Sequence, residues 1–111
     1  PLTGNRVTLA PEPSTQANGM VFSNVQTSTA SLSFTAANPV PDGYLGVRRT
    51  GLAPTGSPVD GITYSVGGTL VDGTIAFIGS GSNYSLSGLE SNANTFIAVY
   101  AFNGTGASTN Y

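Results

Sequence analysis

The chain has 111 residues, of which 39% are hydrophobic and 7% charged, and its formal net charge is −2. Three arginines without any lysine cannot build the clustered cationic surface that phosphate backbones require, so the composition argues against nucleic-acid binding. No run reaches the roughly 20 apolar residues of a membrane span, so membrane insertion is not expected. The length fits one domain, and the missing initiator methionine suggests a segment cut from a longer protein.

Glycine or proline interrupts the chain nearly every ten residues and no window has a helical period, a pattern that predicts an all-β sandwich of about seven strands in two antiparallel sheets. Residues 1–18, rich in proline and polar side chains, predict a tail or inter-domain linker, and residues 19–111 predict the β domain. Predicted strands lie at residues 20–25, 30–36, 44–49, 62–66, 74–78, 84–89 and 96–102, with a short last strand ending at Tyr111.

Several predicted strands alternate between apolar and polar side chains. In residues 30–36, Leu32, Phe34 and Ala36 point one way and the hydroxyl side chains point the other way. The same alternation places Ile97 and Val99 on the inner face of a central strand. The predicted core comprises Phe22, Val25, Leu32, Phe34, Leu45, Val47, Leu89, Ile97 and Val99.

The sequence offers little for catalysis, since it has no histidine, lysine or cysteine to act as a base or nucleophile. The dipeptides Asp42-Gly43, Asp60-Gly61 and Asp72-Gly73 indicate turns, in which aspartate accepts backbone N–H bonds and glycine adopts positive φ. We therefore predict a non-catalytic protein without a cofactor or a metal site. Weak calcium binding near Asp60 and Asp72 stays open, because hard cations take carboxylate and carbonyl oxygens.

The stretch "SGLESNANTFIAVYAFNGTG" at residues 87–106 resembles the E–F–G region of fibronectin type III domains. Gly88-Leu89, Val99, Ala101, Asn103 and Gly106 fall on the family pattern, and "NVQTSTASLSFTA" resembles its A–B region. The resemblance covers residues 13–111 and looks closest to modules of large secreted or surface proteins of Bacteroidetes-type bacteria.

Two positions depart from the family pattern. Phe34 stands where the family usually has tryptophan, and Thr95 stands at the corner tyrosine. We expect Leu89 packing and Asx-type turns from Asn92 or Asn94 to hold that corner instead. The resemblance implies an extracellular or cell-surface module whose partners are neighbouring domains of the same polypeptide. It implies a structural spacer or, as an alternative, a binding module for carbohydrate or a surface protein.

One candidate ligand surface follows from the outward residues of the strand at 96–102. Phe96, Tyr100 and Phe102 share its outer face, and with residues 44–49 as its neighbour we expect Tyr44 and Arg48 on the same face. Such a patch could stack sugar rings or dock a neighbouring domain. The alternative is purely structural, with Arg48 lying across Tyr100 as a cross-strand pair.

Overall fold

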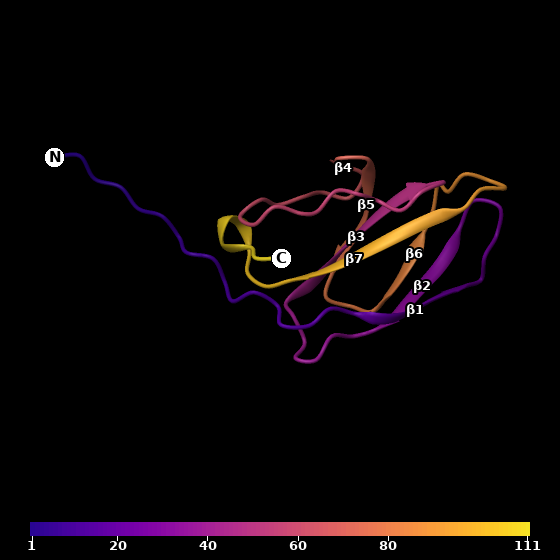
Figure 1. Cartoon of the computed structure of the whole chain (residues 1–111), viewed down its shortest axis with the longest axis horizontal. Coiled ribbons are helices and arrows are strands. Elements are labelled where there is room, and N and C mark those ends of the chain that lie inside the picture. The colour runs from indigo at the N-terminus through magenta and orange to yellow at the C-terminus, as the bar shows by residue number, and fades with distance from the viewer.

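The computed structural model describes residues 1–111 and consists of two antiparallel sheets packed face to face (Figure 1). The first sheet has the order β1-β2-β6 and the second has the order β4-β5-β3-β7. The seven strands confirm the predicted all-β sandwich. The strands are β1 (Asn18–Ser23), β2 (Ala30–Thr35), β3 (Gly43–Thr50), β4 (Thr69–Leu70), β5 (Gly73–Gly79), β6 (Asn83–Leu86) and β7 (Thr95–Phe102).

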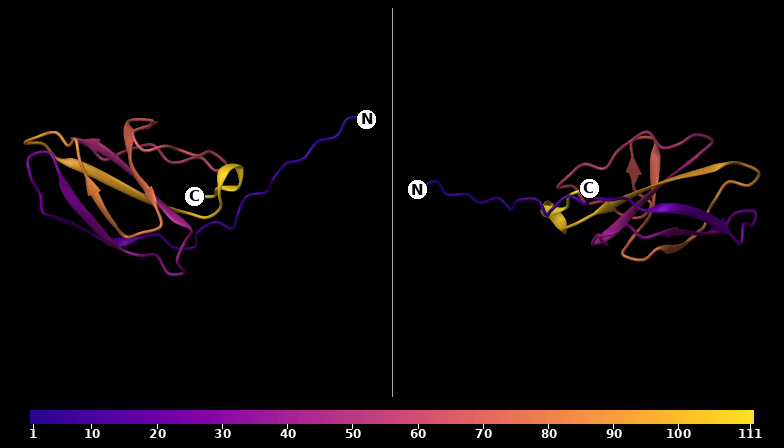
Figure 2. Two further views of the ribbon diagram at one scale, coloured as in Figure 1. Left: turned by 180° about the vertical axis from the view of Figure 1, so that it is seen from behind. Right: turned by 60° about the horizontal axis from the view of Figure 1, so that its bottom comes forward.

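A single 3-10 turn, Gly106–Ser108, is the helical element of the chain, and no helix is long and apolar enough to cross a membrane. The first residues form an extended tail that leaves one end of the sandwich (Figure 2). Close to that end the chain is already tied to the domain. The backbone N–H of Ala10 donates to the Ser108 carbonyl at 2.8 Å, and Gln16 Oε1 accepts from the N–H of Ala101 at 2.8 Å.

Two predicted strands are wrong. Residues 62–66 form no strand and belong to the long connection between β3 and β4, where Tyr64 accepts a hydrogen bond from the N–H of Val59 through its hydroxyl. The last strand is reduced to one antiparallel bridge between Asn103 and Asn110. Tyr111 does not pair with β7. Its N–H donates to Asp60, and its hydroxyl donates to the Ile62 carbonyl.

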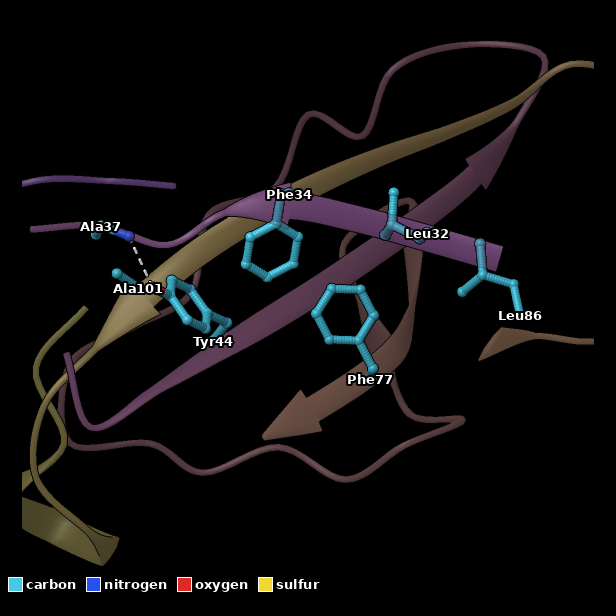
Figure 3. Packing of buried hydrophobic residues seen from close by; sticks show 7 residues of the cluster. All are labelled: Leu32, Phe34, Ala37, Tyr44, Phe77, Leu86 and Ala101. Carbon is cyan, nitrogen blue, oxygen red and sulfur yellow. Dashed lines mark hydrogen bonds between the residues drawn. The ribbon is translucent and has the colours of Figure 1, made fainter. Parts of the chain in front are cut away.

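The main core lies between the two sheets and is centred on Phe34, as Figure 3 shows. The Phe34 ring meets Tyr44 edge-on, with ring centroids 4.9 Å apart, and stacks on Phe77 at 6.3 Å. Leu32 and Phe34 are buried as predicted, while Ala37, one residue later than expected, takes the place of Ala36. The buried members of this cluster are Leu32, Phe34, Ala37, Tyr44, Phe77, Leu86 and Ala101.

Strand β3 is oriented the other way round from the prediction. Tyr44 points between the sheets, fully buried, and its hydroxyl accepts a hydrogen bond from the N–H of Ala37 at 2.9 Å. Leu45 and Val47, predicted to share the core with Phe34, lie on the opposite face of the sheet. They are nevertheless buried, at 1% and 0% exposure, because a second cluster covers that face.

The second cluster lies on the outer face of the β4-β5-β3-β7 sheet. Leu45, Val47, Leu70 and Ile75 are its buried members. The long β3–β4 connection and the C-terminal segment close over them. The partly buried aromatics that pack against the cluster are Tyr64, Tyr100, Phe102 and Tyr111.

Strand β1 contributes to neither cluster, and the prediction of Phe22 and Val25 as core residues is wrong. Their exposed fractions are 41% and 69%. β1 is an edge strand of its sheet, and every one of its residues is exposed. The predicted inner residues Leu89, Ile97 and Val99 do pack against the main core, partly buried.

Candidate functional site

The outer row of β7 was the surface singled out by the sequence. Ile97, Val99 and Ala101 turn toward the main core, as the alternation predicts. Tyr100 and Phe102 pack against the second cluster on the opposite face. Phe96 has the same phase and is 39% exposed. The prediction of which β7 residues face outward is therefore right.

The prediction that Tyr44 and Arg48 share that face is wrong. In the β3–β7 register Tyr44 is opposite Ala101 and Arg48 is opposite Ile97, so both belong to the inward phase. Arg48 reaches across to the other sheet, where its Nη1 donates to the carbonyl of Ser87 at 2.6 Å. Because Arg48 and Tyr100 lie on opposite faces, neither the five-residue patch nor the Arg48–Tyr100 pair exists.

The outer aromatics are largely engaged in packing. The Tyr100 hydroxyl donates a hydrogen bond to the carbonyl of Gly56 at 3.1 Å. This bond holds the β3–β4 connection against the sheet. The Phe102 ring lies 5.7 Å from that of Tyr111 and directly over Gly43, where a Cβ atom would meet Phe102 Cζ at 2.5 Å. A side chain at Gly43 would displace the Phe102 ring. Phe96 is left as the exposed aromatic of the row.

Arg49, which the sequence did not single out, is the arginine on this face. It stands opposite Phe96 in the register, and its Nη1 lies 2.8 Å from Asp72 Oδ2. The hydroxyl and the backbone N–H of Thr55 also donate to Asp72, and these bonds, with a smaller contribution from Arg49, lower the pKa of that carboxyl. Because Arg48 and Arg49 are adjacent residues of the same type, the sequence does not indicate which of the two side chains faces outward.

The three Asp-Gly aspartates accept backbone N–H bonds, as predicted, but from distant segments. Asp42 accepts from Gly104 at 2.8 Å and Asp60 from Tyr111 at 2.9 Å. Each carboxylate ties its own loop to another part of the chain. The expected positive φ occurs at Gly61, with φ +79°, and not at Gly43 or Gly73, which lie in strands.

Asp60 accepts a hydrogen bond from Tyr111 and Asp72 accepts from Thr55, so the two carboxylates stabilise different parts of the chain. No three acidic side chains gather into a group that could hold a metal ion. The Arg49 guanidinium lies 2.8 Å from the Asp72 carboxylate and already balances its negative charge. Calcium binding near these two residues stays an untested prediction.

At the corner before β7 the expected packing of Leu89 is present, but neither Asn92 nor Asn94 makes the side-chain hydrogen bond of an Asx-type turn. Asn92 adopts φ +55°, a left-handed conformation that asparagine tolerates. Leu89 packs against the main core, and its N–H donates to the Ser28 carbonyl at 2.9 Å. The Ser91 hydroxyl adds a bond to the Thr27 carbonyl at 2.8 Å. These contacts tie the corner to the β1–β2 connection.

No protein-family model matches the sequence, and no curated protein matches it significantly. Among solved structures, the chain is similar to a fibronectin type III domain of human collagen XX, with 20% identity and a TM-score of 0.55 over 96% of this chain and 92% of that one. It is also similar to part of a structure of titin kinase and its flanking domains, at 10% identity and a TM-score of 0.51. That match covers 95% of this chain and 16% of the titin chain. Together with the strand order, these likenesses establish that the chain has the fibronectin type III-like β-sandwich fold.

Proposed function

We propose that this domain is a non-catalytic spacer module of a secreted or cell-surface multidomain protein, with the neighbouring domains of the same polypeptide as its partners. Fibronectin type III-like domains are commonly structural modules of such proteins, and the titin match lies within a longer chain. The fold by itself does not assign a function, so the proposal rests on what the polar side chains do.

The observation that carries the proposal is that the polar and aromatic side chains stabilise the connections. Asp42, Asp60 and Asp72 each accept a backbone N–H from a remote segment. Arg48 crosses from one sheet to a loop of the other, and Arg49 pairs with Asp72. This network restrains both ends of the sandwich, which suits a module that must keep its shape between neighbours.

The alternative, a binding module for carbohydrate or a protein partner, has one residue in its favour. Phe96 is exposed and lies across from Arg49, but Tyr100 and Phe102 are partly covered and do not extend the surface. A single exposed ring is ordinary on a folded surface. We therefore place spacing before binding.

A distance measurement tests the spacer role. Two fluorescent proteins are fused to the ends of the chain, and energy transfer is compared with that across a Gly/Ser linker of the same length. Such a linker has a broad distribution around roughly 60 Å, from about 5–6 Å times the square root of its length. The folded module is expected to give one narrower distribution, and indistinguishable distributions would contradict the proposal.

A sugar-binding screen tests the alternative. The chain and its Phe96→Ser variant are applied to an array of polysaccharides and oligosaccharides. The spacer role predicts no specific signal for either protein. A signal from the parent chain that disappears in Phe96→Ser would favour the binding module.

A further inference from the structure

Three aromatic rings from separate parts of the chain line one small pocket at an end of the sandwich. Tyr64 comes from the β3–β4 connection, Phe102 from the end of β7 and Tyr111 from the C-terminal segment. The pocket has a volume of about 220 Å³, and Leu45 and Ile78 also line it. Figure 1 shows the connection and the C-terminal segment meeting at this end of the domain. The rings therefore converge although they are far apart in the sequence.

Hydrogen bonds to the backbone hold two of the three rings in position. The Tyr64 hydroxyl accepts from the N–H of Val59 at 3.0 Å, and the Tyr111 hydroxyl donates to the Ile62 carbonyl at 2.9 Å. Both bonds end on the β3–β4 connection, so the hydroxyls are engaged with the protein itself. Rings that are fixed before a ligand arrives lower the entropic cost of binding it.

The rings are tilted against one another. The Tyr111 ring lies 6.0 Å from that of Tyr64 at an angle of 62°, and 5.7 Å from that of Phe102 at an angle of 59°. The bridge between Asn103 and Asn110 places the C-terminal segment alongside the end of β7 and so brings Tyr111 beside Phe102. Tilted rings can present their faces to one small guest from different sides, which parallel stacked rings cannot.

The lining is mostly apolar and has few free hydrogen-bonding groups. Thr109 is 3% exposed, and its hydroxyl donates to the Gly106 carbonyl at 2.8 Å. The other two threonines of the lining, Thr63 and Thr105, are exposed to water. A sugar or a primary ammonium needs several hydrogen-bond partners and is therefore poorly matched to this pocket.

The electrostatics of the pocket favour a cation. Aromatic faces carry the negative part of the ring quadrupole and attract positive charge. No charged side chain lines the pocket, and Asp60 lies close by, since its carboxylate accepts from the N–H of Tyr111 at 2.9 Å. The Arg6 guanidinium lies near Gly61 but is not part of the lining. The whole chain has a net charge of −2.

We propose that this pocket binds a quaternary ammonium group of the trimethylammonium type. Such a group has a positive charge and an apolar surface but no N–H to donate, which matches aromatic faces without free acceptors. A volume of 220 Å³ is below the roughly 300–1,000 Å³ of sites for drug-sized ligands, so it suits a small head group. The binding is independent of the spacer role, because a loaded module keeps the same shape.

Titration of the isotope-labelled full chain with choline chloride, followed by nuclear magnetic resonance, tests the site. A ligand with few non-hydrogen atoms should bind with a Kd on the order of 1 mM. We expect the amide signals of Gly104 and Tyr111 to shift with choline and not with sodium chloride. Neohexyl alcohol, the uncharged isostere with carbon in place of nitrogen, should bind about tenfold more weakly. Equal affinities, no shifts with choline, or tighter binding of glucose than of choline overturns the proposal.

Vesicles distinguish the two sources of such a head group, a phosphocholine lipid and a free solute. The chain is sedimented with phosphatidylcholine vesicles and with phosphatidylglycerol vesicles, which lack the group. Binding to phosphatidylcholine alone that choline displaces supports the site with a lipid as its ligand. Choline binding without vesicle binding supports the site with a free solute as its ligand. Equal binding to both kinds of vesicle, unaffected by choline, refutes the lipid as the ligand.

Ring replacement tests the lining. Tyr64→Leu keeps the pocket apolar but removes one ring, and should weaken choline binding about threefold to fivefold. Tyr64→Phe keeps the ring and should bind choline more tightly than Tyr64→Leu. Phe96→Leu is the matched control, because Phe96 is an exposed ring outside the pocket, and it should bind choline like the parent chain. Unchanged binding in Tyr64→Leu overturns the proposal, and if that variant fails to fold, the comparison of choline with neohexyl alcohol on the parent chain decides.

Discussion

Replacing Tyr44 by phenylalanine removes one hydroxyl from the centre of the sandwich and leaves the ring in place. Tyr44 is 0% exposed, and its hydroxyl accepts from the N–H of Ala37, which is itself 3% exposed. The variant keeps the edge-on contact with Phe34, so the buried apolar area hardly changes. The N–H of Ala37 loses its partner, which costs about 1–3 kcal/mol when the donor stays buried.

That loss is a large share of the 5–15 kcal/mol that stabilises a typical domain. Urea unfolding followed by circular dichroism should show a lower midpoint with an unchanged slope. In thermal unfolding the midpoint should fall by roughly 4–8 °C for each kcal/mol lost. Tyr100→Phe is the matched control, and its loss should be smaller, because the hydroxyl that bonds Gly56 is only partly buried.

A loss below about 0.5 kcal/mol in Tyr44→Phe, the usual range for surface positions, would refute the inward orientation of Tyr44. The orientation of Leu45 would then be refuted as well, because neighbouring residues in a strand point to opposite faces.

Two further predictions concern packing and pH. Gly46→Ala should destabilise the domain by about 1–3 kcal/mol in the same urea assay, because the new Cβ would overlap the buried Phe77 ring. Gly81→Ala, in open space, should be neutral. Burial, with Tyr64 and Asp60 adding to it, raises the pKa of Tyr111 to about 12, so the folded state holds this proton more tightly than the unfolded chain. The resulting stability is present below the ordinary tyrosine pKa of about 10 and is lost as the pH rises toward 12. Tyr111→Phe should flatten this part of the plot of unfolding free energy against pH. An unchanged plot would contradict the assignment.

The alternation was most informative in β2, where one face is buried and the other carries hydroxyl side chains. There it placed Leu32 and Phe34 correctly. It also placed Ile97 and Val99 correctly in β7, although the outer residues of that strand are partly covered. β3 is different, because its outer face is covered and both Tyr44 and Leu45 are buried. When both faces are apolar, the alternation contains no signal for which face is inward.

The candidate site depended on this ambiguous strand. The outward row of Phe96, Tyr100 and Phe102 was predictable from β7 alone. The positions of Tyr44 and Arg48 required the phase of β3, and a shift of one residue moved both to the other face. The engagement of Tyr100 with Gly56 was not predictable, because it depends on where a long connection of irregular structure lies.

The cover formed by the β3–β4 connection has a consequence for protein engineering. Surface loops are the usual places for grafted peptides, since they tolerate insertions. In this domain the connection after β3 shields Leu45 and Val47 and accepts one hydrogen bond, from Tyr100, at Gly56, so an insertion there would open a hydrophobic layer to water. The short connection between β5 and β6 crosses from one sheet to the other and contributes no residue to either cluster. Its Ser82 carbonyl accepts a hydrogen bond from the N–H of Phe34, but Gly81 has open space around it. A display scaffold built on this sandwich would carry its variable peptide at Gly81 and keep the longest loop unchanged.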